Sequence, residues 1–244
     1  MIRTEALTKR FGDNTAVNAL DLDIPEGEFF CFLGPNGAGK TTTIKMLTGL
    51  MQPTSGKAFV GGFNVVEKPV EAKELLGYIP DHPFLYEKLT GREFMRFVAG
   101  LYKMSDADLD GHIDELLGIF EVDRVSNQLI ENYSHGMRQK LSFASCFLHY
   151  PKVVIVDEPW VGLDPKNIRA VKSYLKNKSR DEGLTVLMST HTLSIAEEVA
   201  DRIGIINRGT LLHVGTVSEI MDLEQSSSTL EDVFLELTKG DEVA

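Results

Sequence analysis

The sequence is short of the features that mark membrane-spanning, secreted and nucleic-acid-binding chains. No apolar run approaches the roughly 18 residues that a spanning helix needs, so any membrane role requires a partner protein. The N-terminal residues 1–5 do not have the pattern of a signal peptide, and we expect a soluble chain. Lys and Arg number 25 against 36 Asp and Glu, and a net charge of −11 argues against a duplex nucleic-acid partner.

Cysteine is also scarce. Cys31 and Cys146 each lie in an apolar segment, which favours buried, reduced thiols over a disulfide. The chain has no internal repeat and no low-complexity tract. Its 244 residues, 43% of them hydrophobic, suffice for one sizeable core with an inserted subdomain.

A phosphate-binding loop is the most specific signal that is present. The pattern G-x-x-x-x-G-K-[ST] is matched, with one further threonine, by Gly34, Pro35, Asn36, Gly37, Ala38, Gly39, Lys40, Thr41 and Thr42. The glycines let backbone N–H groups point at phosphate oxygens, Lys40 reaches the outer phosphates, and the Thr41 hydroxyl ligates Mg²⁺. A glycine-rich turn that matches by chance is the alternative. The apolar strand expected over 28–33 and the helix expected over 41–50 argue against it.

The remaining pattern predicts an α/β fold with a mainly parallel sheet and a helical insertion. Strand patterns over 2–11 and 16–24 precede the loop, and a short strand pair over 57–66 and a strand over 77–80 follow it. Helical periodicity dominates about 84–150, over 91–104, 106–120 and 136–150. Strands over 153–156, 184–189 and 202–207 then alternate with helices over 165–180 and 193–200. We expect one nucleotide-binding domain over 1–215, with the helical subdomain at about 84–150 inserted in it, and a short helical extension over 216–244.

Two carboxylates follow the apolar strand 153–156. In an open parallel sheet the carboxyl ends of the strands carry the ligand site, so Asp157 is predicted to hold Mg²⁺ and Glu158 to polarise the attacking water as general base. The alternative reading of Asp157 is a turn residue after a core strand. The phosphate-binding loop upstream favours the metal site.

A run beginning at Tyr133 carries the first resemblance to a known family. Residues 133–139 read YSHGMRQ, at a predicted helix start shortly before the Asp-Glu strand. The chain here resembles the ATP-binding subunits of ABC transporters, whose signature usually reads LSGGQ. Ser134 and Gly136 match, whereas His135 and Met137 depart. The resemblance implies that Ser134 and Gly136 contact the γ-phosphate of ATP bound to a second subunit; the alternative is an ordinary helix cap.

Three further positions continue the resemblance. Residues 162–165, GLDP, match the family's D-loop, which crosses the dimer interface, and also suit a turn before a helix. His191 matches the switch histidine that reaches the γ-phosphate. Phe11 stands where the family stacks an aromatic ring on adenine, although a core phenylalanine is the alternative.

Asp81 departs from the family, which usually has glutamine after this strand. A third carboxylate near Asp157 and Glu158 is tolerable only with the metal present or if Asp81 turns away. We expect Asp81 to keep a Mg²⁺ or water role and to relay contact with a transporter. The aromatic segment 82–86 follows, either as part of the groove for the transporter's coupling helix or as core of the helical subdomain.

The resemblance implies that 1–215 is an ABC ATPase domain, a P-loop α/β core with an antiparallel β portion near its N-terminus. It also implies that the ATPase uses ATP and Mg²⁺, with Glu158, His191 and Lys40 as catalytic residues. Two such subunits, a homodimer or a homologous pair, are expected to sandwich two ATP molecules and drive a separate integral membrane permease. Residues 133–137 and 230–234 resemble the drug and antibiotic exporter branch. The expected location is the cytoplasm, peripheral at the inner face of the cell membrane. The alternative is a soluble ABC ATPase of DNA repair or translation; no nucleic acid is expected as a partner.

Overall fold

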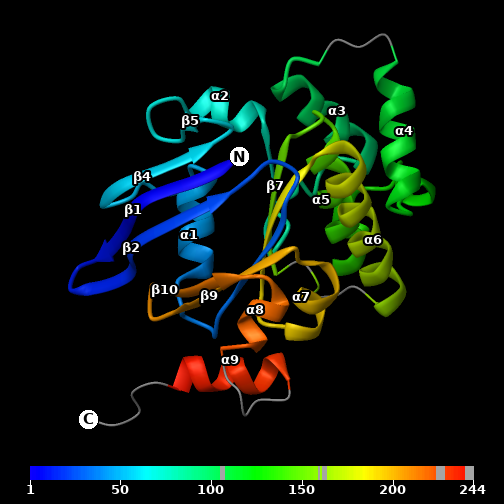
Figure 1. Ribbon diagram of the computed structural model, residues 1–244. Coiled ribbons are helices and arrows are strands. Elements are labelled where there is room, and N and C mark those ends of the chain that lie inside the picture. Colours follow the sequence, from blue (N-terminus) through cyan, green and yellow to red (C-terminus); the bar gives the residue numbers. More distant parts are fainter. Residues whose placement is uncertain (105–107, 159, 161–163, 224–228, 240–244) are drawn as a thin grey trace.

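The computed structural model describes residues 1–104, 108–158, 160, 164–223 and 229–239, which form two β-sheets and a helical lobe (Figure 1). The first sheet is antiparallel with strand order β2-β1-β4-β5. Its strands are β1 (Ile2–Phe11), β2 (Asn14–Ile24), β4 (Ser55–Val60) and β5 (Phe63–Asn64). The short helix α2 (Pro69–Glu74) follows β5 and leads to the second sheet.

The second sheet has the strand order β10-β9-β3-β8-β7-β6. Its strands are β3 (Phe29–Leu33), β6 (Leu76–Ile79), β7 (Val153–Asp157), β8 (Thr185–Thr190), β9 (Arg202–Asn207) and β10 (Thr210–Gly215). All neighbours are parallel except β9 and β10, which a tight turn at Arg208-Gly209 makes antiparallel. The predicted α/β class with a mainly parallel sheet is confirmed.

β10 is missing from the sequence-based prediction. Apolar side chains occur on both of its faces, because Leu211 is half-buried whereas Leu212 and Val214 are exposed. The period-2 alternation that marks a half-buried strand is therefore absent. The strand forms because the turn at Gly209, with φ of +78°, returns the chain alongside β9.

The central strand β3 separates two hydrophobic cores. Phe30 and Phe32 face helix α1 (Lys40–Leu47) and the first sheet. Phe29, Cys31 and Leu33 face the other way, into a core shared with α6 (Pro165–Glu182) and α7 (Leu193–Val199). Both cysteines are buried and free, as predicted, and burial raises the pKa of each thiol.

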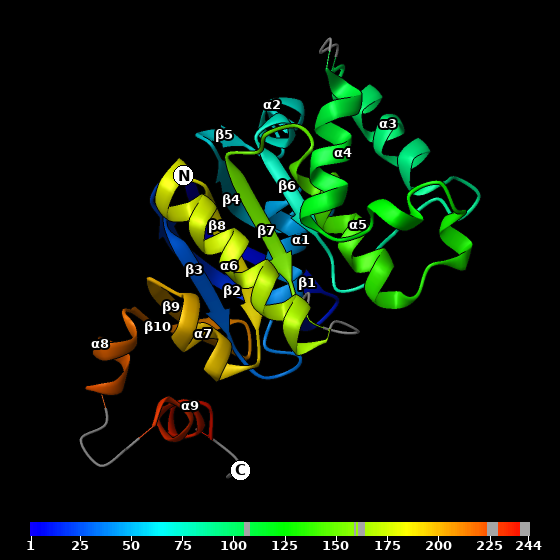
Figure 2. The same ribbon diagram turned by 90° about the vertical axis from the view of Figure 1, so that its right-hand side faces the viewer.

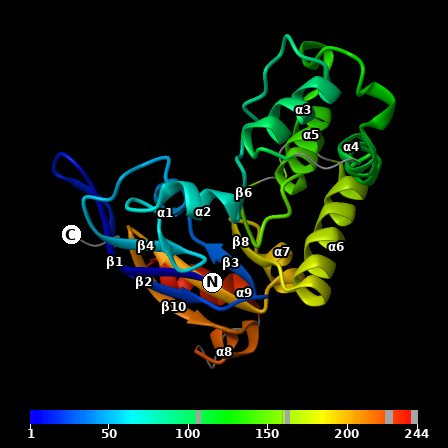
Figure 3. The same cartoon turned by 90° about the horizontal axis from the view of Figure 1, so that it is seen from above.

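The helical lobe stands beside the sheets and is connected to the second sheet, through β6 and β7 (Figures 2 and 3). It contains α3 (Gly91–Leu101), α4 (Leu109–Ile119) and α5 (His135–Phe147), with single 3₁₀ turns at Asp123–Val125 and Ile130–Asn132. Helix α3 begins with a reciprocal cap, in which the Thr90 side chain accepts from Glu93 N and Glu93 accepts from Thr90 N. The helices predicted within 84–150 therefore all form, each within three residues of its expected start.

The C-terminal helices α8 (Val217–Met221) and α9 (Leu230–Lys239) pack beneath β9 and β10 (Figure 1). Leu230 and Val233 are buried, and the Thr238 carbonyl oxygen accepts a hydrogen bond from the Asn207 side chain at 3.1 Å. The division of the chain at residue 215 stays a prediction. Among the helices of the described ranges, none combines the length and apolarity needed to cross a membrane.

Candidate functional site

The loop between β3 and α1 is bent tightly against neighbouring backbone. Gly39 has φ of +109°, and a Cβ there would lie 2.6 Å from the carbonyl oxygen of Ala16. A Cβ on Gly34 would lie 2.4 Å from the carbonyl oxygen of Ile206. The path of the loop thus requires glycine at both positions, and it ends directly at the first residue of α1, Lys40. The strand–loop–helix context that a phosphate-binding loop needs is present.

Lys40 is folded back into this loop. Its Nζ donates to the carbonyl oxygens of Gly34 at 2.6 Å and Pro35 at 3.2 Å, and lies 3.5 Å from Glu158 Oε1. Burial lowers the pKa of Lys40, and the nearby Glu158 carboxylate partly offsets that shift. Incoming phosphate oxygens would replace carbonyl oxygens as partners of the ammonium group.

Asp157 ends β7 and is held by two hydroxyl groups. Ser189 Oγ of β8 donates to Asp157 Oδ1 at 2.5 Å, and Thr41 Oγ1 of α1 lies 3.4 Å from the same oxygen. Burial raises the pKa of Asp157, and these two hydrogen bonds act in the opposite direction. Ser189 was not singled out from the sequence; its signal was a hydroxyl residue at a strand end, two positions before His191.

The donors around Asp157 fit a magnesium ion. Asp157 Oδ2 is buried and has no hydrogen-bond partner among the described residues, although a buried carboxylate oxygen normally has one. The hydroxyl of Thr41 and the carboxylate of Asp157 are the hard oxygen ligands that Mg²⁺ takes. No set of three or more His, Cys, Asp or Glu within the described ranges is placed to hold a metal. The cation would therefore need phosphate oxygens and water as its other ligands.

Glu158 lies between the two other predicted catalytic residues. Its Oε2 lies 2.5 Å from Nδ1 of His191, which follows β8, and its Oε1 faces Lys40. The backbone of Glu158 has φ of +43°, an uncommon value for a residue with a side chain, and its N–H donates to the Ser189 carbonyl oxygen at 3.2 Å. The ends of β7 and β8 therefore bring Glu158, His191 and Lys40 together.

The predicted signature forms the beginning of α5. Ser134 is the N-cap, and its Oγ accepts a hydrogen bond from Met137 N at 3.3 Å. Arg138 anchors this end of the helix, because its guanidinium donates to Glu87 at 2.6 Å and to the carbonyl oxygens of Tyr133 and Glu131. Both readings of Ser134, helix cap and anion contact, are compatible with this geometry.

Asp81 turns its carboxylate toward the next residue. Its Oδ1 accepts from His82 N at 2.8 Å and its Oδ2 lies 3.1 Å from His82 Nδ1. The His82 ring lies 6.1 Å from the His135 ring, at an interplanar angle of 68°. Asp81 thereby connects the end of β6 with the start of α5, and its charge also contributes to the raised pKa of Asp157. The magnesium role of Asp81 stays a prediction.

We expect Asp81→Ala to lower ATP turnover about tenfold when the membrane partner is present, since outer-shell partners of metal sites typically contribute this much. Asp81→Gln, which keeps an oxygen acceptor for His82, should retain more activity. The measurement is steady-state phosphate release, with Asp13→Ala in an exposed turn as matched control. Wild-type turnover in both Asp81 variants would refute the role.

The predicted adenine contact at Phe11 and the predicted D-loop at 162–165 are only partly defined by the structure. Phe11 is 49% exposed at the end of β1, so it is not a core phenylalanine, and its ring lies 5.2 Å from the Lys9 ammonium. Gly162 and Leu163 of the predicted D-loop lie outside the described residues. Asp164 caps α6, accepting from Asn167 N at 2.9 Å, as the turn reading of this motif requires.

Both aromatic side chains at 84 and 86 are exposed, whereas Leu85 between them packs against the core of the lobe. Phe84 is 87% exposed, whereas the Tyr86 ring packs edge-on against Phe97 of α3 at 5.1 Å. A groove of about 320 Å³ lies next to α3, between the lobe and the part of the core formed by the end of α1, α2 and β6. It is lined by Thr48, Leu50, Lys73, Leu76, Gly77, Tyr78, Val98, Leu101, Tyr102, Ser145, Cys146 and His149.

Comparison with known proteins gives a consistent result. Residues 17–161 match the family model described as ABC transporter. The chain is 37% identical over 215 residues to a bacitracin transport ATP-binding protein of Bacillus licheniformis, covering 87% of this chain and 68% of that one. A solved ATP-binding subunit of an ABC transporter has a TM-score of 0.90 at 32% identity and covers 97% of this chain and 99% of that one. The fold is also similar, with a TM-score of 0.81 at 24% identity, to a dimeric post-hydrolysis ATP-binding cassette bound to ADP and Pi; 88% and 98% of the chains are covered.

Proposed function

The chain belongs to the ABC transporter family as an ATP-binding, ATP-hydrolysing subunit, and we propose that two copies, or one copy and a homologue, close around two ATP molecules to drive a separate exporter permease. Such a pair works at the inner face of the cell membrane, where the permease holds it. Transport energy comes from closing the pair on ATP and opening it after hydrolysis.

The observation that carries this proposal is the position of Glu158 between Lys40 and His191. The carboxylate is placed to accept a proton from the attacking water, while Lys40 neutralises charge on the outer phosphates. His191 orients Glu158 and can turn to the γ-phosphate. Magnesium, held by Thr41 and Asp157, would supply charge neutralisation on the phosphates.

The start of α5 supports a composite site. Ser134 and Gly136 present a helix N-terminus of a 13-residue helix, where backbone N–H groups and the helix dipole favour an anion. The γ-phosphate of ATP on the second subunit is the proposed anion. The fold relative bound to ADP and Pi is described as a dimer, which is compatible with the proposed pairing of two subunits.

The groove beside α3 is the proposed binding site for the permease. Leu50 is 61% exposed and Leu101 is 65% exposed, and an amphipathic helix of the partner would cover both. The relative named for bacitracin transport supports an exporter. The permease, not this subunit, is expected to determine which substrate is transported.

We test the proposal by affinity purification from detergent-solubilised membranes of the source cells. We expect a polytopic membrane protein to co-purify with the wild type and to be lost with Leu101→Glu. Leu223→Glu, another exposed leucine outside the groove, is the matched control and should retain the partner. ATP turnover of the isolated subunit should be the same in all three proteins.

Co-purification of nucleic acid or ribosomes in place of a membrane protein would favour the soluble ATPase of DNA repair or translation. A membrane protein that stays bound to Leu101→Glu would leave the transporter role standing and refute the assigned groove.

A further inference from the structure

Helix α5 links the signature serine, Ser134, to the strand that carries Asp157. It begins beside Ser134, ends at Phe147, and the short connection 148–152 then leads into β7, which ends at Asp157. The direction of α5 relative to β7 therefore decides where Ser134 lies relative to Asp157 and Glu158. What fixes the connection also fixes that relation.

Two parallel ring stacks hold the connection. The His149 ring lies 3.8 Å from the Tyr102 ring at 10°, and the Tyr150 ring lies 4.6 Å from the His112 ring at 15°. Tyr102 is the C-cap of α3, and His112 belongs to α4. Each neighbouring helix of the lobe thus supplies one ring, and each of two consecutive residues of the connection supplies the other. We call these two stacks the hinge clamp.

Each histidine of the hinge clamp also contacts a carbonyl oxygen. His149 Nε2 lies 3.2 Å from the Leu76 carbonyl oxygen in β6, and His112 Nε2 lies 3.2 Å from the Leu148 carbonyl oxygen. Burial lowers the pKa of His149 to about 4, so the ring is neutral near pH 7 and its Nε2–H donates to Leu76. Its Nδ1 is buried and has no partner within the described residues. The ring is therefore oriented by one hydrogen bond and by the stack on Tyr102.

The backbone of the connection is held in an uncommon conformation. Tyr150 has φ of +54°, a region that a residue with a bulky side chain seldom adopts. Such a conformation persists only where surrounding contacts determine it. The stack on His112 is one of these contacts, and it lies directly at the strained residue.

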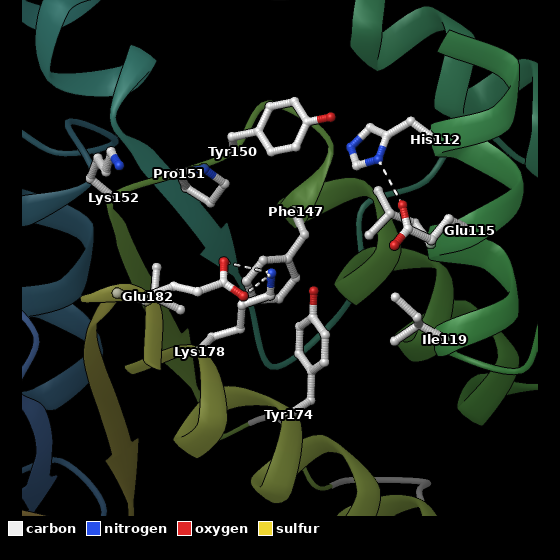
Figure 4. A pocket seen from close by; sticks show the side chains of 12 residues that line it. His112, Glu115, Ile119, Phe147, Tyr150, Pro151, Lys152, Tyr174, Lys178 and Glu182 are labelled. Carbon is white, nitrogen blue, oxygen red and sulfur yellow. Dashed lines mark hydrogen bonds and ion pairs between the residues drawn. The ribbon is translucent and has the colours of Figure 1, made fainter. Parts of the chain in front are cut away.

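A pocket lies beside the hinge clamp, although the lobe packs closely against α6 next to it, with the Phe120 and Phe147 rings 5.2 and 5.0 Å from the Tyr174 ring. A cavity of about 310 Å³ lies between α4, the connection and α6, with Ile119, Tyr150 and Tyr174 around it (Figure 4). Because this pocket is open to solvent, the connection has no closely packed neighbour on that side, and the two ring stacks contribute more to its position. At the pocket, Lys178 pairs with Glu182, but ion pairs with exposed partners contribute little.

We propose that the hinge clamp consists of positioning residues, which fix α5 against β7 and so hold the signature serine at a set place relative to Asp157 and Glu158. The ring stacks and histidine hydrogen bonds of the clamp join α3, α4, β6 and the connection, outside the phosphate-binding loop. Loosening the clamp should leave binding of nucleotide to the subunit's own loop unchanged. It should impair the step in which Ser134 meets the nucleotide of the second subunit, an expectation that rests on the proposed function.

The first measurement does not depend on that function. Spin labels at Gly118→Cys on α4 and Lys57→Cys on β4 report the distance between lobe and sheets by pulsed dipolar spectroscopy. Gly118 is an exposed helical position with nothing within 4 Å of an added Cβ, and the native thiols are buried and unreactive. We expect a narrow distribution for the otherwise native chain and for Tyr102→Phe, which keeps the ring. Tyr102→Leu and His112→Leu should each broaden it.

The second measurement is turnover with ADP binding as reference. An aromatic pair contributes roughly a factor of 2 to 12, so each leucine variant should lose about fivefold in kcat, with the Kd for ADP within about twofold of wild type. All turnover is measured on the isolated subunit, without the permease that is proposed to bind the groove beside Tyr102, and there Tyr102→Phe should match the wild type. The double variant should lose less than the product of the single losses, because both stacks hold one connection.

Unchanged label distances in both leucine variants would overturn the proposal, as would equal broadening in Tyr102→Phe. If one leucine variant fails to fold, judged by its ADP binding, the other decides. Absence of ATP turnover in the native chain would count against the proposed function alone, because the label distances still test the hinge clamp.

Discussion

Glu158→Gln is expected to bind ATP as tightly as the wild type and to lose at least about 100-fold in turnover. Removing a general base typically lowers the rate by 10²- to 10⁴-fold, because the attacking water then has no proton acceptor. Glutamine keeps the size of the side chain and a carbonyl oxygen within reach of His191 and Lys40. Binding groups thus remain while the base is removed.

The check combines phosphate release with ATP binding and size-exclusion chromatography. The variant should accumulate as a closed dimer in ATP and return to monomer in ADP. Glu197→Gln, an exposed position on α7, is the matched control and should turn over normally. Hydrolysis by Glu158→Gln at the wild-type rate would show that another group activates the water.

Lys40→Ala is expected to lower turnover about 1,000-fold and to weaken ATP binding at least tenfold. The structure places this buried ammonium among carbonyl oxygens of the loop, where phosphate oxygens would bind, and each preorganised charge contact in such a site contributes about 10² to 10³ in rate. Lys40→Arg should not restore activity. The larger planar guanidinium does not fit a position at which the lysine is only 5% exposed.

Fluorescent nucleotide binding and phosphate release measure the two effects. Lys45→Ala, on the same helix but outside the loop, is the control for helix stability. If Lys40→Ala hydrolysed ATP at more than about a tenth of the wild-type rate, the loop would not be the catalytic phosphate site.

The central part of the site was predictable because its residues lie at strand ends that the sequence marks locally. The loop follows an apolar strand, and Asp157 and Glu158 end another. The contacts among these residues could not be predicted from the sequence. Glu158 and His191 are 33 positions apart, and Ser189 reaches Asp157 because β7 and β8 pair in one particular register. A motif names the side chains at a strand end but does not specify that register.

Other features depend on partners that no local pattern identifies. Asp81 could be recognised as an unusual residue, but its pairing with His82 follows from the turn after β6. The hinge clamp needs Tyr102 and His112 to meet two consecutive residues of a distant connection. Apolar periodicity showed that α3, α4 and α5 pack together without showing which rings touch.

The position of β3 at the centre of its sheet has a consequence for synthesis. All residues of β3 are buried, yet its two neighbours in the sheet, β8 and β9, are synthesised much later. In the folded chain, Gly27 N just before β3 donates a hydrogen bond to Thr185, a residue 158 positions downstream. At roughly 5–20 residues per second, a ribosome needs about 8–30 s to cover that interval. During this time Phe29-Phe30-Cys31-Phe32-Leu33 has both strand edges unpaired and prone to aggregation. A lower growth temperature or added chaperone should therefore raise the yield of soluble protein by reducing aggregation of this unpaired strand during synthesis. The stability of the folded chain should not change.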